Sequence, residues 1–123
     1  MQGFLLYLGA TLTAIWGIAH LFPTKDVVAG FGDISEDNRH IITMEWIVEG
    51  VSLIFIGLLV AIVTFIDPQT VVSRTVYKIS AVVLLVLALI SLFTGFKVKF
   101  LPFKLCPFIF TGSAILMISG SLV

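Results

Sequence analysis

The sequence has little charge. Only 11% of its 123 residues are Asp, Glu, Lys or Arg, against about 25% in a typical soluble domain. Hydrophobic residues make up 59% of the chain, and the mean hydropathy is +1.19. This composition excludes an ordinary soluble domain and predicts a membrane protein. Acidic and basic residues balance at seven each, so no basic surface favours nucleic acid as a partner.

Cysteine is almost absent as well. The single cysteine, Cys106, lies between Leu105 and Pro107 and has no partner in the chain for a disulfide. It therefore gives no information on the redox compartment, and we interpret it as a packing residue.

Metal-ligating residues are few and badly spaced. His20, Glu45, Glu49 and either His40 or Asp37 are suitable ligand types. Di-iron bundles, however, place Glu-x-x-His pairs on several helices, whereas this chain has a lone Glu-x-x-x-Glu and no ligand in its last two apolar segments. We therefore predict neither a metal nor another cofactor.

What the sequence does have is four long apolar segments, at about residues 3–22, 41–66, 76–96 and 103–123. A helix of roughly 20 apolar residues crosses a bilayer. We therefore predict that residues 1–123 form a single all-α domain, an integral membrane four-helix bundle of up-down-up-down topology. The first segment lacks the positive flank and cleavage site of a secretory signal, so we expect it to be retained as a span.

Basic residues predict the orientation. The first and third loops and their flanks carry five of them, and the opposite side carries two, Arg74 and Lys78. The positive-inside tendency then places loops one and three in the cytoplasm and both termini outside.

Small residues predict how the spans pack, because helices in lipid associate by close backbone approach. Gly9, Thr13 and Gly17 recur every four residues in the first span, and His20 follows three residues later. The third segment has Ser80, Ala88, Ser91 and Gly95 at similar spacing, and the fourth has Gly112, Ser113, Ser119 and Gly120. We interpret these faces as packing seams.

Two glutamates persist at the start of the second span. At about 100° per residue, Asn38, Glu45, Glu49 and Ser52 share one stripe of a helix. An ionised side chain in mid-membrane costs about 3 kcal/mol, so we expect this stripe to point into the bundle, with the glutamates near its rim. Alternatively, the carboxylates are solvated or ion-paired and are favoured there by the helix dipole.

His20 ends the first span where the second begins, so antiparallel helices should bring it close to Glu45 and Glu49. Two carboxylates that share a site divide the roles of proton donor and proton acceptor. These three are our candidate catalytic residues. The candidate substrate-binding residues are Trp16, Phe31, Asn38, Trp46 and Ser52.

The pattern of the first loop, residues 23–40, predicts that it is ordered and covers the glutamates. Thr24 is placed to cap a short segment that ends at Gly30-Phe31-Gly32, and Ser35 is placed to cap the next helix. The two glycines lack the third glycine and the βαβ context of a nucleotide-binding fingerprint.

The stretch GIAHLFPT, residues 17–24, closes the first of four spans in a short chain. In this it resembles the first-helix pattern of DoxX-like small membrane proteins, which implies a four-helix membrane bundle. The combination of a histidine, two glutamates and a tryptophan is also similar in kind to sterol-isomerase-like membrane enzymes, in which carboxylates move protons on a buried lipid.

Three functional hypotheses follow. The first is an acid–base enzyme, of the isomerase, cyclase or hydratase/hydrolase type, acting on a lipophilic small molecule from the membrane. The second is a non-enzymatic membrane subunit or lipophilic-ligand-binding protein, working as a homo-oligomer or within a larger membrane complex. The third is proton or cation passage through an oligomer, since intramembrane acids often mark such paths.

Overall fold

The computed structural model describes residues 1–123 and contains helices only. In chain order the elements are α1 (Gln2–Leu21), α2 (Thr24–Ala29), α3 (Glu36–Ile66), α4 (Val71–Thr94), the short 3₁₀ helix η1 (Gly95–Lys97) and α5 (Leu101–Leu122).

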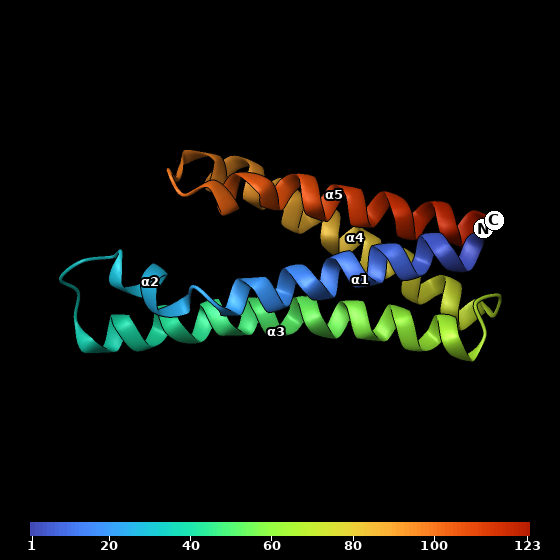
Figure 1. Ribbon diagram of the computed structural model, residues 1–123, viewed down its shortest axis with the longest axis horizontal. Coiled ribbons are helices and arrows are strands. Elements are labelled where there is room, and N and C mark those ends of the chain that lie inside the picture. The colour runs from blue at the N-terminus through green and yellow to red at the C-terminus, as the bar shows by residue number, and fades with distance from the viewer.

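Four helices are long and apolar enough to cross a membrane: Gln2–Leu21, Glu36–Ile66, Val71–Lys97 and Leu101–Leu122. Both termini lie at one end of the bundle, together with the α3–α4 connection, and the first and third loops lie at the other end (Figure 1). The predicted all-α, up-down-up-down membrane bundle is confirmed, and the chain is a multi-pass membrane protein.

Two helices begin about five residues before the apolar segments that predicted them, because a hydroxyl side chain caps each start. The Ser35 hydroxyl accepts the Asn38 N–H at 3.2 Å, and the Thr70 hydroxyl accepts the Ser73 N–H at 3.0 Å. Such caps satisfy backbone donors that a first helical turn leaves free. The extra turns contain the charged residues Glu36, Asp37 and Arg39 in α3 and Arg74 in α4.

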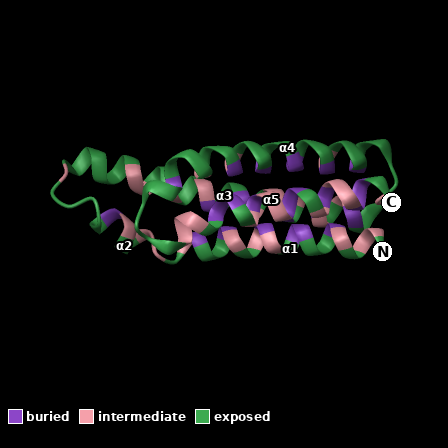
Figure 2. Cartoon of the chain, turned by 90° about the horizontal axis from the view of Figure 1, so that it is seen from above, coloured by how far each residue is buried: buried purple, intermediate pink, exposed green.

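The helices are arranged with α1 between α3 and α5, while α4 packs mainly on α5. Buried positions form inward stripes along each long helix, and the outer faces are exposed and largely apolar (Figure 2). The main core includes Leu6, Leu53, Tyr77, Leu84, Phe110 and Met117. An apolar outer face is expected where lipid replaces water.

Close approach of α1 to α3 depends on glycines. A Cβ at Gly17 would lie 2.7 Å from the Gly50 carbonyl oxygen, and one at Gly57 would lie 2.6 Å from the Ala10 carbonyl oxygen. Either distance is shorter than any ordinary contact, so only glycine fits. The whole predicted small-residue face of α1, from Gly9 to His20, is buried, which confirms that seam.

On the last two long helices the outcome is mixed. Ser80, Ala88 and Gly95 are buried as predicted, and so are Ser113 and Gly120. Gly112 is different: a Cβ there would meet nothing within 4 Å. The prediction that Gly112 belongs to the packing seam was wrong, since residue 112 is only half-buried and a Cβ there would touch no neighbouring helix.

Candidate functional site

The candidate site lies where α1 ends and α3 enters the bundle. Side chains satisfy the last carbonyls of α1, which have no partner within the helix. Trp46 Nε1–H donates to the His20 carbonyl oxygen at 2.7 Å, and the Thr24 hydroxyl donates to the Leu21 carbonyl oxygen at 2.6 Å. The Trp46 bond ties the end of α1 to α3 across 26 residues of sequence.

His20 is the most buried polar group of this region, with 8% of its surface exposed. Its ring stacks on Trp46 with a centroid distance of 3.9 Å and an angle of 16° between the planes. His20 Nε2 lies 3.4 Å from Glu49 Oε2, within ion-pair distance but without the alignment of a hydrogen bond. The Glu49 side chain is 41% exposed, so the pair joins a buried imidazole to a carboxylate at the rim.

Beside this pair is a cavity of about 120 Å³, here called the inner pocket. Its walls come from α1, the first loop, α3 and the start of α5, and its lining residues are Trp16, Ala19, His20, Pro23, Trp46, Phe100, Pro102, Phe103 and Cys106. The indole N–H of Trp16 is buried near the Cys106 thiol and makes no hydrogen bond of good geometry. Trp16 and His20 both line this mostly apolar pocket, and neither Trp16 Nε1 nor His20 Nε2, both of them covered atoms, makes a hydrogen bond.

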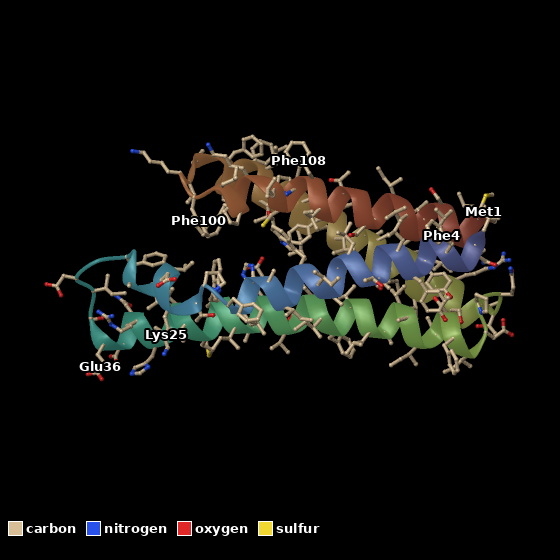
Figure 3. All side chains as sticks on the ribbon, in the orientation of Figure 1. Met1, Phe4, Lys25, Glu36, Phe100 and Phe108 are labelled. Carbon is tan, nitrogen blue, oxygen red and sulfur yellow. The ribbon has the colours of Figure 1, made fainter.

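A larger cavity of about 580 Å³, here called the outer cavity, lies between α2 and the third loop. It is lined by Asp26, Val27, Gly30, Phe31, Val98, Lys99, Phe100 and Phe103. In Figure 3, Phe100 lies on the side of the third loop that faces α2, whereas Phe108 points away from it. Phe100 and Phe103 line both cavities, so these two rings form the wall between them.

Prolines and a glycine position the Phe103 ring. Pro102 occupies the first turn of α5, where its fixed φ favours helix initiation. Pro107 lacks the N–H that would bond the Phe103 carbonyl, and Gly95 lies against that oxygen, where a Cβ would be only 2.9 Å away. The Phe103 ring then meets Trp46 edge-on, with centroids 5.4 Å apart.

The structure brings four of the eight sequence-predicted site residues together. His20, Trp16 and Trp46 line the inner pocket, and Glu49 contacts His20. Phe31 lies apart from them in the outer cavity and is 55% exposed.

Asn38, Glu45 and Ser52 are exposed and line neither cavity, so the expectation that their stripe points into the bundle was wrong for all three. The inward face of α3 consists instead of Gly50, Leu53, Gly57, Val60 and Thr64. Close contact with α1 requires the glycines to face inward, and this rotates the polar stripe outward. Ser52 meets its hydrogen-bond need within α3 by donating to the Val48 carbonyl.

Sequence reasoning missed the half of the site that α5 and the third loop provide, mainly Phe100, Phe103 and Cys106. A signal for them was present. The predicted topology places loops one and three at the same end, so the aromatic stretch FLPF, residues 100–103, had to lie near His20. No three His, Cys, Asp or Glu side chains cluster in the structure in a way that suits a metal ion.

Comparison of the chain with protein-family models, with curated proteins and with solved structures finds no match. The resemblance to DoxX-like proteins therefore stays a prediction, and functional inference depends on the site itself.

Proposed function

We propose that this membrane protein binds a neutral lipophilic small molecule, with the polar end of that molecule in the inner pocket. The observation that carries the proposal is that two residues lining an aromatic pocket have buried polar atoms without a hydrogen bond, Trp16 Nε1 and His20 Nε2. A buried polar group without a partner costs about 1–3 kcal/mol. Once a small rotation of the Trp16 ring turns its N–H toward the pocket, a ligand oxygen that accepts this N–H removes part of that cost.

The walls restrict the chemistry of the ligand. Aromatic and apolar side chains dominate the lining, which favours an apolar body. An anionic end would meet the Glu49 carboxylate, 3.4 Å from His20 Nε2, and so a neutral acceptor such as a carbonyl, ether or hydroxyl oxygen fits better. An engineered cavity of about 150 Å³ holds benzene, so the 120 Å³ pocket accepts an end no larger than one ring.

Mass spectrometry of what purifies with the protein tests this proposal. We expect a neutral lipophile in organic extracts of the wild type, and at least a fivefold lower amount with Trp16→Phe, which keeps an aromatic side chain, although a smaller one, and removes the N–H. The matched control is Glu45→Gln, because Glu45 is exposed and lines neither cavity. Extracts of the wild type and of Trp16→Phe that contain the same lipophiles in the same amounts would contradict the proposal.

A second candidate function, acid–base catalysis on the bound molecule, is favoured by the His20–Glu49 pair. A carboxylate that contacts an imidazole can orient it and compensate the charge it gains when it takes a proton. Such a pair suits an isomerase, cyclase or hydratase that moves a proton on a lipophilic substrate. In this scheme Glu49 assists His20, and the exposed Glu45 has no part.

Glu49→Gln and Glu45→Gln form a matched pair for this second candidate, because the residues lie one helical turn apart and only Glu49 contacts His20. When the identified lipophile is incubated with protein, we expect conversion to fall about a hundredfold or more with Glu49→Gln, within the 10²–10⁴-fold range of general acid–base effects. Glu45→Gln should convert it normally. Equal conversion by both variants excludes the catalytic role and leaves ligand binding intact.

A further inference from the structure

We infer that the outer cavity binds the apolar chain of the ligand whose polar end occupies the inner pocket, so that the ligand class is a single-chain neutral amphiphile. This inference rests on the proposed function and extends it, because the inner pocket alone is too small to hold a lipid-sized molecule.

Size is the first reason. The outer cavity, at about 580 Å³, falls within the range of about 300–1,000 Å³ that is usual for ligand sites, whereas the inner pocket, at about 120 Å³, falls below it. A ligand confined to the inner pocket would bury only a ring or a short group. A chain that continues past the pocket buries most of its length in the larger space.

Continuity is the second reason. Phe100 and Phe103 line both cavities, so a chain that leaves the inner pocket passes directly between or beside these two rings. Phe100 is 46% exposed and its ring centroid lies 6.0 Å from that of Phe103. Aromatic side chains turn about two torsions only, so a modest rotation of Phe100 joins the cavities without moving the backbone.

The distribution of polar atoms is the third reason. Trp16 and His20, whose buried side-chain nitrogens Nε1 and Nε2 lack a hydrogen bond, line the inner pocket. The outer cavity has no unpaired buried polar atom, and its apolar walls include Val27, Phe31 and Val98. Its charged residues, Asp26 and Lys99, are both exposed and remain solvated at the rim. The polar end of a ligand therefore gains most in the inner pocket and its chain gains most in the outer cavity.

A photoreactive probe tests the inference directly. The probe is a 13-carbon methyl ketone with a diazirine near the far end of its chain, added to the full-length protein in lipid nanodiscs. After irradiation, adducts are mapped by mass spectrometry. We expect them on residues 26–31 and 98–103, and we expect excess unlabelled 2-tridecanone to lower their yield at least fivefold. Adducts confined to lipid-facing positions such as Val82 and Val86 of α4 would overturn the inference.

Val27→Trp adds a bulky ring to the wall of the outer cavity and leaves the lining of the inner pocket unchanged. We expect it to lower the yield of adducts on residues 98–103 at least fivefold, whereas Val82→Trp, on the lipid-facing side of α4, leaves the yield unchanged. If Val27→Trp leaves the adducts on residues 98–103 unchanged, the chain does not occupy the outer cavity.

Labelling of Cys106 distinguishes a failure of this inference from a failure of the proposed function. Cys106 lines the inner pocket but not the outer cavity, and it is the only thiol of the chain. 2-Butanone, which has the polar end and almost no chain, should slow methanethiosulfonate labelling of Cys106 equally in the wild type and in Val27→Trp. Protection without cross-links in the outer cavity overturns the present inference alone. If neither 2-butanone nor 2-tridecanone slows the labelling of Cys106, and the probe gives no specific adducts, the proposed function is overturned as well.

Discussion

At the scale of single residues, Trp46 both stabilises the contact between α1 and α3 and positions side chains of the candidate site. Its indole N–H satisfies a carbonyl at the end of α1, its face stacks on His20, and its edge meets Phe103. One side chain thus fixes the position of the imidazole and of the ring that separates the two cavities. The sequence alone predicted Trp46 as a substrate-binding residue but did not predict its hydrogen bond, because the identity of a long-range acceptor depends on how α1 and α3 are aligned.

Trp46→Phe should destabilise the protein by about 1 kcal/mol beyond the effect of the smaller ring, because the His20 carbonyl loses its donor and this is the usual net value of one hydrogen bond. Trp16→Phe is the matched control. It removes an indole N–H that has no partner, so the ligand-free protein should lose little stability. Equilibrium unfolding in mixed micelles measures both, and an equal loss for the two variants would contradict the assigned hydrogen bond.

At the scale of whole helices, the packing of α1 on α3 determines which side chains reach the candidate site. The α1–α3 contact places a glycine opposite backbone at both Gly17 and Gly57, and this fixes the rotation of α3. That rotation brings Glu49 to His20 and turns Glu45, Asn38 and Ser52 outward. The sequence predicted the seam on α1 from its four-residue spacing. It did not predict which side of α3 faces α1, because the polar residues and the glycines of α3 lie on different sides of that helix.

Gly17→Ala should destabilise the bundle by about 1–3 kcal/mol, the typical cost of overpacking, because the added Cβ meets the Gly50 carbonyl at 2.7 Å. Gly112→Ala is the control, since its Cβ meets nothing within 4 Å, and alanine is the better helix former. Thermal unfolding in detergent should therefore rank Gly112→Ala at or above the wild type and Gly17→Ala below it. The reverse order would contradict the proposed packing of α1 on α3.

For the molecule as a whole, the residues that line the two cavities come from the elements at the end that carries the first and third loops (Figure 1). The four spans and their antiparallel order were predictable because hydrophobic length and loop length are encoded locally. The cavities were not, because they depend on where α2, the FLPF stretch and the end of α1 meet in three dimensions. Basic residues favour a cytoplasmic location for this end, and we propose that orientation.

Cysteine labelling in intact cells tests the orientation. In a chain with Cys106→Ala, we expect Gln69→Cys, in the connection between α3 and α4, to react with a membrane-impermeant maleimide. Ser35→Cys, in the first loop, should react only after the cells are permeabilised. The opposite pattern would place the site on the outer face of the membrane.

Labelling of Cys106 before and after removal of the bound molecule tests the central claim, ligand binding in the inner pocket, most directly. Protein purified gently from its membrane should react slowly with methyl methanethiosulfonate. It should react at least fivefold faster after exhaustive detergent exchange, and slowly again when the organic extract is added back. An unchanged labelling rate through all three stages, with the fold intact by circular dichroism, would contradict ligand binding in this pocket.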